Sequence, residues 1–252
     1  MPYFNANSAR SIYIEMYFND KKLATGTGFF CESNVGSILF TNRHNVTGRD
    51  SFTGQPLSDT CGTPNKLRFT CLSPRGPIVQ QVDLYEDEEM TEPVWAEHPD
   101  LGEKVDVVGL IVEKFKGKFP HYVVPFKDWN RWDVGSQVHV IGFPFSLSAD
   151  GFAIWATGYI ASEPDVDYGG LPVFLIDCRT RPGQSGSQVI AQFKPGDTVE
   201  KDGKLYQAQA HMTHFLGIYS GRIHKDSDLG RVWKPSVVRD IIDYAERHLT
   251  NK

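Results

Sequence analysis

The chain has 252 residues, of which 40% are apolar and 23% charged, and its formal net charge is -5. This length fits one large β domain or two small ones, and the apolar content is enough for a buried core. The weakly acidic charge balance and the short basic clusters exclude nucleic acid as an expected partner. No apolar run approaches the roughly 20 residues of a membrane helix, which excludes the membrane.

Most of the sequence consists of short alternating or apolar runs that are broken by Gly, Pro, Asn and Asp, a pattern typical of an all-β sandwich or barrel. The clearest run is the first, in which apolar and polar residues alternate as in a half-buried strand, and Asn19 to Lys22 then predicts a hairpin turn. The predicted strands are Ser11 to Phe18, Leu23 to Cys31, Ser37 to Thr41, Lys66 to Leu72, Ile78 to Tyr85, Val105 to Val112, Gln137 to Phe143, Phe152 to Ala161, Pro172 to Cys178, Gln188 to Phe193 and Gln207 to Tyr219.

Three further segments organise the chain. Arg49 to Asn65 and Lys194 to Gly203 are polar and rich in turn residues, so we expect surface loops. Lys114 to His121 is polar, contains Gly and Pro, and predicts a linker that divides the chain into residues 1–118 and 119–252. After Pro235, apolar residues recur at the spacing of one helical face and predict a packing helix: Val238, Ile241, Ile242, Ala245 and Leu249.

The segment Arg181 to Ser187 carries the sharpest chemical signal, a serine between glycines at Gly183-Gln184-Ser185-Gly186. A serine hydroxyl needs a base to remove its proton, and the oxyanion formed on attack needs preorganised donors, which the flexible backbone at a glycine can provide. A Gly-Ser turn without chemistry is the alternative. The run is not G-x-S-x-G and continues as a strand, so it does not fit an α/β-hydrolase.

Two other residues could complete such a site. His44 stands at the end of the apolar run Leu39 to Thr41, and histidine is the natural general base near neutral pH. Asp106 opens the apolar run Val107 to Ile111, where a buried carboxylate needs a hydrogen-bond partner such as a histidine. Each residue alone also fits a structural role, and Asp100 is the rival acid.

The order His, Asp, Ser is that of chymotrypsin, and with its motifs the sequence resembles the trypsin-like serine proteases, especially small bacterial members without disulfides. The family's motifs are matched by Gly26-Thr27-Gly28-Phe29-Phe30, Thr41-Asn42-Arg43-His44-Asn45-Val46, Asp106-Val107-Val108-Gly109-Leu110, Gly183-Gln184-Ser185-Gly186-Ser187 and Phe215-Leu216-Gly217-Ile218-Tyr219-Ser220-Gly221. The resemblance implies two six-stranded antiparallel β barrels, the first carrying the histidine and the aspartate, and the second carrying the serine and the C-terminal helix.

The resemblance also assigns roles. Ser185 would be the nucleophile, His44 the base and Asp106 the residue that orients His44. The N–H groups of Gly183 and Ser185 would form the oxyanion hole, and Ser220 and Gly221 would lie along an extended substrate. Arg179, six positions before the serine, would favour an acidic substrate side chain at the pocket floor.

Gln184 departs from the family pattern, because secreted members have an aspartate there that pairs with a newly cut N-terminus. We therefore expect an enzyme made without a zymogen cut. The expected function is hydrolysis of a protein or peptide by a serine endopeptidase without metal or organic cofactor. A pseudoprotease that binds a peptide or protein, and a serine esterase, are the alternatives. The sequence does not identify a regulatory partner protein, and whether one exists is left open.

The compartment is predicted from two observations. Residues 1–19 lack the basic region, apolar run and cleavage site of a signal peptide. No two cysteines have C-x-x-C spacing, which favours free thiols in a reducing cytoplasm over disulfides; the four are Cys31, Cys61, Cys71 and Cys178. His211 and His214 come nearest to a zinc motif but would point to opposite faces of a strand.

Overall fold

The computed structural model describes residues 4–73, 76–112, 121–123, 132–201 and 203–248. In its first half, the alternation of apolar and polar residues in β1 (Ser11–Phe18) produces alternating buried and partly buried positions from Ile12 to Tyr17, and Phe18 at the end is exposed. A turn at Asn19, with a left-handed φ of 52°, joins β1 to β2 (Lys21–Ser33). The elements of this half are α1 (Ala6–Arg10), β1 (Ser11–Phe18), β2 (Lys21–Ser33), β3 (Gly36–Thr41), α2 (Arg43–Thr47), β4 (Lys66–Ser73), β5 (Gly76–Asp83), β6 (Trp95–Ala96), η1 (Gly102–Lys104), β7 (Val108–Val112) and β8 (His121–Val123).

These strands form one sheet in the order β5-β4-β1-β2-β3-β7-β6, and β8 adds to β2. The β2–β8 pair is parallel, whereas the other strand pairs of this sheet are antiparallel. The first half therefore differs in detail from six antiparallel strands: the described part has eight. The predicted linker lies almost entirely in residues 113–120, outside the described residues, and the division at 118/119 stays a prediction.

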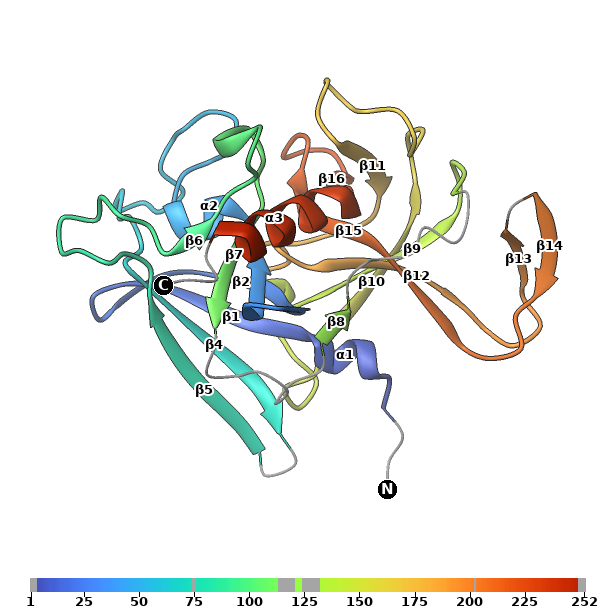
Figure 1. Ribbon diagram of the computed structural model, residues 1–252, viewed down its shortest axis with the longest axis horizontal. Coiled ribbons are helices and arrows are strands. Elements are labelled where there is room, and N and C mark those ends of the chain that lie inside the picture. Colours follow the sequence, from blue (N-terminus) through green and yellow to red (C-terminus); the bar gives the residue numbers. More distant parts are fainter. Residues whose placement is uncertain (1–3, 74–75, 113–120, 124–131, 202, 249–252) are drawn as a thin grey trace.

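The second half contains a closed six-stranded barrel in the order β10-β11-β16-β15-β12-β9. A separate hairpin of β13 and β14 projects from the body of the molecule at the right of Figure 1. The elements of this half are β9 (Gln137–Gly142), η3 (Pro144–Ser146), β10 (Ile154–Ile160), β11 (Val173–Asp177), β12 (Gln188–Phe193), β13 (Thr198–Lys201), β14 (Lys204–Gln207), β15 (Met212–Arg222), β16 (Leu229–Trp233) and α3 (Pro235–His248).

Helix α3 begins at Pro235, as the sequence predicts, and buries the expected apolar face; Leu249 lies outside the described residues. In Figure 1 the helix crosses between the two halves, beside β7 and β15. Its residues share one apolar core with residues of both halves, among them Phe40 of β3 and Trp233 of β16. The helix therefore fixes how the two halves meet, and the site residues lie at that junction.

The all-β architecture with a closed barrel and a C-terminal helix is confirmed, but several elements differ from the prediction. The polar segment predicted as a loop contains β13, and β16 was not predicted. The strand predicted from Val105 begins only at Val108, so Asp106 precedes it. His44 lies one residue into α2 rather than at a strand end. Both residues thus lie on irregular or helical backbone beside the sheet.

Candidate active site

His44 and Asp106 form a buried pair through two hydrogen bonds. The backbone N–H of His44 donates to Oδ1 of Asp106 at 2.9 Å, and Nδ1 of the imidazole lies 2.7 Å from Oδ2. The Asp106 side chain is 1% exposed and that of His44 is 13% exposed. Because the aspartate accepts at Nδ1, the neutral imidazole carries its proton there and leaves Nε2 as an acceptor.

The buried carboxylate of Asp106 has further support. The hydroxyl of Ser220, on β15, donates to Oδ2 at 2.6 Å. The side-chain amide of Asn42 donates to the backbone carbonyl of Asp106 at 2.7 Å. The His44 N–H from the first half and the Ser220 hydroxyl from the second thus offset the cost of burying this charge, while Asn42 fixes the backbone of Asp106.

The electrostatics of the pair follow from this geometry. Burial alone lowers the pKa of His44, but the charge of Asp106 and its hydrogen bond outweigh that effect, so the pKa is raised from its ordinary value. Burial also opposes ionisation of Asp106, yet His44 and the Ser220 hydroxyl lower its pKa overall. Asp106 is therefore an anion at neutral pH, and it stabilises the protonated imidazole.

Ser185 faces the same cleft as this pair. A cavity of about 280 Å³ is lined by His44, Asp106, Ser185 and Ser220 together with Gly221. These side chains therefore share one solvent-accessible space, although they are far apart in the sequence. His44 is on α2, Asp106 precedes β7, Ser185 precedes β12 and Ser220 is on β15. The rival acid Asp100 is exposed, and its backbone N–H donates to His98.

The turn before Ser185 is closed by its own residues. Oε1 of the buried Gln184 accepts the backbone N–H of Arg181 at 2.8 Å, and the N–H of Gln184 donates to the carbonyl of Arg181 at 3.2 Å. Gly183 has a φ of 95°, and a Cβ there would lie 2.4 Å from the carbonyl oxygen of Phe143. Only glycine fits this position without displacing the backbone.

The N–H groups of Gly183 and Ser185 donate to no protein acceptor among the described residues. The peptide between Pro182 and Gly183 is held from its other side, because Pro182 accepts the N–H of Phe145 at 2.7 Å. In a trans peptide the carbonyl and the following N–H point in opposite directions, so this bond turns the Gly183 N–H away from η3. The N–H groups of Gly183 and Ser185 are therefore available to a ligand.

Thr27, on β2, is a site residue that the sequence reasoning did not identify as one. Its hydroxyl donates to the carbonyl of Gly183 at 2.8 Å, and its backbone N–H donates to the carbonyl of Ser185 at 2.8 Å. The N–H of Phe143 donates to the same hydroxyl at 3.2 Å. The buried threonine thus ties the serine turn to the first sheet. Its position between two glycines was the signal that could have found it.

The predicted substrate-binding residues fall into two groups. Ser220 and Gly221 line the cleft. Arg179 is not part of this lining: its side chain is 79% exposed, and Nε lies 4.0 Å from a carboxylate oxygen of Asp228. Its role in selecting an acidic side chain stays a prediction.

Two loops that the sequence reasoning did not connect with the site complete the cleft wall. The first follows α2, and the second joins β15 to β16 and continues into β16. Their lining residues are Asp50, Ser51, Phe52, Leu57, Arg222, His224, Lys225 and Arg231. Three of the lining residues in this second region are cationic, although the whole chain is weakly acidic: Arg222 at the end of β15, Lys225 in the loop and Arg231 in β16.

The sequence model of the trypsin-like peptidase domain matches residues 26–193, two thirds of the chain. The chain belongs to the trypsin-like peptidase family. It is therefore a serine protease by class, a hydrolase whose substrates are proteins or peptides. The matched range includes His44, Asp106 and Ser185.

Solved structures agree with the fold of this trypsin-like peptidase. A serine endoprotease from Yersinia pestis superimposes with a TM-score of 0.57 at 12% sequence identity, covering 98% of this chain and 69% of the other. The active form of a protease from M. tuberculosis gives 0.54 at 19% identity, covering 94% of this chain and 81% of the other. No sequence among curated proteins matches significantly.

All four cysteines of the peptidase are free thiols, and three of them are buried. Burial raises the pKa of Cys71 to about 12 and that of Cys178 to about 11, so these thiols are protonated and inert. In the described part of the chain no three Cys, His, Asp or Glu side chains could hold a metal ion together. His211 precedes β15, and His214 packs its ring against Trp132 and Phe193.

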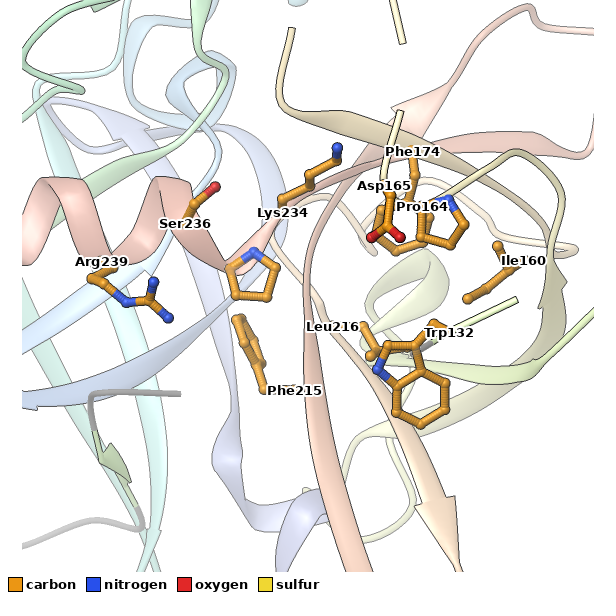
Figure 2. A pocket seen from close by; sticks show the side chains of 11 residues that line it. Trp132, Ile160, Pro164, Asp165, Phe174, Phe215, Leu216, Lys234, Ser236 and Arg239 are labelled. Carbon is orange, nitrogen blue, oxygen red and sulfur yellow. The ribbon is translucent and has the colours of Figure 1, made fainter. Parts of the chain in front are cut away.

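A second cavity of about 330 Å³ lies between the closed barrel and the start of α3 (Figure 2). Trp132, Phe174 and Leu216 contribute apolar walls, and Lys234 and Arg239 lie at its edge. The proposed site residues do not line it. No helix in the described ranges has the length and apolar character to cross a membrane.

Proposed function

We propose that this peptidase is a serine endopeptidase that works through an acyl-enzyme intermediate, with Ser185 as nucleophile, His44 as base and Asp106 as the residue that orients His44. The observation that carries the proposal is the buried hydrogen-bonded chain from Ser220 through Asp106 to His44, which opens on the same cleft as Ser185. The chemistry requires no metal or organic cofactor.

In the first step, Oγ of Ser185 attacks the carbonyl carbon of the scissile peptide bond, and Nε2 of His44 takes the hydroxyl proton. The carbonyl oxygen becomes an oxyanion, which the free N–H groups of Gly183 and Ser185 stabilise. The new positive charge on His44 is stabilised by Asp106 at 2.7 Å.

His44 then gives its proton to the nitrogen of the leaving amine, the C–N bond breaks, and an ester on Ser185 remains. Water attacks this ester in the second step. His44 takes a proton from the water and returns it to Oγ of Ser185, which restores the enzyme and releases the new carboxylic acid. An extended substrate would lie along Ser220 and Gly221, next to the reacting bond.

Labelling with a fluorophosphonate probe tests the nucleophile directly. We expect one adduct per chain, mapped to Ser185 by peptide mass spectrometry and abolished in Ser185→Ala. The same preparations are then incubated with a peptide library. Internal cleavage by the native chain, absent in Ser185→Ala, supports the endopeptidase.

Two outcomes would contradict the proposal. A chain that binds peptides but neither takes the label nor cleaves would be a pseudoprotease. Hydrolysis of activated esters without cleavage of any peptide would indicate an esterase. Circular dichroism and thermal melting of Ser185→Ala ensure that its lost activity does not reflect lost folding.

A further inference from the structure

The end of β15, the loop after it and β16 together give one wall of the cleft a basic character. Arg222, Lys225 and Arg231 all line the cavity that contains His44 and Ser185. Within the described residues, the side chains of Arg222 and Lys225 have neither an ion pair nor a hydrogen bond. Their donors are available to a ligand in the cleft.

Arg231 is held in place from two sides. Its guanidinium lies over the ring of Phe52, with Cζ 3.9 Å from the ring centroid. One nitrogen, Nη1, donates to the backbone carbonyl of Arg222 at 3.0 Å. The guanidinium has five donors, so several remain for a carboxylate.

The two carboxylates in the cleft lining, Asp50 and Asp106, both accept hydrogen bonds from neighbouring groups. Oδ1 of Asp50 accepts from the N–H groups of Phe52 and Thr53 and from the Thr53 hydroxyl. Asp106 is 1% exposed and is bonded to His44 and Ser220. Nδ1 of the exposed His224, another lining residue, lies 3.7 Å from a carboxylate oxygen of Asp226. Among the charged side chains of the lining, Arg222 and Lys225 are the ones without an ion pair or hydrogen bond within the described residues, whereas Asp50 keeps a negative charge that acts on Arg231.

The position of Arg222 relative to the reacting bond follows from chain geometry. Ser220 contacts Asp106 beside His44, and Arg222 stands two residues further along the chain. Extended chains rise about 3.3 Å per residue, so a peptide lying along this strand would place a side chain two or more residues from the scissile bond beside Arg222.

We infer that the peptidase selects substrates with an aspartate or glutamate two to four residues from the scissile bond, held by Arg222 with Arg231 and Lys225 beside it. The inference rests on the proposed endopeptidase function and names its substrate class. It places acid recognition at the end of β15 and on the adjoining loop and β16, away from the exposed Arg179.

A peptide library with each of the four positions on both sides of the scissile bond varied tests this inference. We expect Asp and Glu to be enriched at one or more positions two to four residues from the cut, and kcat/KM for such peptides to exceed that for Gln and Asn analogues by about tenfold at low salt. Salt should weaken the preference, because screening acts on exposed charges.

Substitution of Arg222 assigns the preference. Arg222→Glu should abolish or reverse the ratio of kcat/KM for the Asp and Glu peptides to kcat/KM for their Asn and Gln analogues, and Arg222→Lys should retain most of it. Lys204→Glu is the matched control, because it alters the net charge equally on the exposed β14 strand. Arg179→Glu tests the rival location.

Binding of a fluorescent acidic peptide to Ser185→Ala, with and without Arg222→Glu, gives a readout that is independent of turnover. Cleavage with no acidic preference, or a preference that Arg222→Glu leaves intact, would overturn the inference and leave the endopeptidase standing. A preference removed by Arg179→Glu instead would move the site to Arg179. A chain that cleaves no peptide would refute the proposed function itself.

Discussion

The hydroxyl of Thr27 donates to the carbonyl of Gly183 at 2.8 Å, across the junction between the two halves of the chain. Both partners are buried. The first sheet thus positions not only the candidate base and acid but also the backbone from which the candidate oxyanion donors project. The site is one unit whose geometry depends on contacts between the halves.

Thr27→Val should lower kcat/KM by about ten- to hundredfold, somewhat less than the loss of a direct oxyanion donor. Valine preserves the shape of threonine, but it leaves the carbonyl of Gly183 and the N–H of Phe143 without their partner. Steady-state kinetics with a peptide substrate measures the effect, which should fall on kcat more than on KM.

Thr27→Ser is the control for this substitution, because it keeps the hydroxyl and should restore most of kcat. If Thr27→Val destabilises the fold without altering kcat below its melting temperature, the threonine has only a structural role.

Asp106→Asn should reduce kcat by about 10⁴-fold, because an amide cannot hold His44 in the required tautomer or stabilise its positive charge. The matched control is Asp100→Asn, which changes an exposed carboxylate and should leave kcat unchanged. Single-turnover assays extend the measurable range for Asp106→Asn. If Asp100→Asn lost more of its kcat than Asp106→Asn, Asp100 and not Asp106 would be the residue that orients His44.

The pH profile should show the raised pKa of His44. The base must be neutral, so kcat/KM should fall as the pH drops through this pKa, with a midpoint above the ordinary imidazole value of about 6.5. NMR titration of the His44 ring in Ser185→Ala measures the same pKa directly. In the double variant Ser185→Ala/Asp106→Asn, burial lowers the pKa of His44 without the opposing charge of Asp106, so the titration midpoint of His44 should move down. An upward or absent shift would contradict the role of Asp106.

Activity should not depend on a new N-terminus, because Gln184 is 1% exposed and already bonds within its own turn to Arg181. A chain with a folded tag before Met1 should keep kcat/KM within about twofold of the untagged chain. Intact-mass measurement combined with active-site titration ensures that the active molecules still carry the tag. Activity confined to trimmed molecules would contradict this prediction.

The sequence predicts best where one face of an element is buried. The alternation in β1 and the apolar face of α3 record burial in a local pattern, and both elements were predicted with nearly their observed bounds. The candidate residues His44, Asp106 and Ser185 could also be proposed, because each stands in a distinctive local context.

Other features of the fold and the site cannot be predicted from a local sequence pattern. β13 and β14 are polar and largely exposed, and β16 contains Gly230 and Arg231 where an apolar run would mark a strand. The contact of Thr27 with Gly183 joins residues that are distant in sequence, and so does the clustering of Arg222 and Arg231 with His44. Only the folded chain brings these groups together.

The place of α3 in the chain has a consequence for synthesis. The helix is translated after every strand, yet it completes the apolar core shared by the two halves. Until α3 has left the ribosome, the core that joins the half carrying His44 to the half carrying Ser185 is incomplete. We therefore expect the cleft to assemble only after α3 has been synthesised, late in the translation of the described part of the chain.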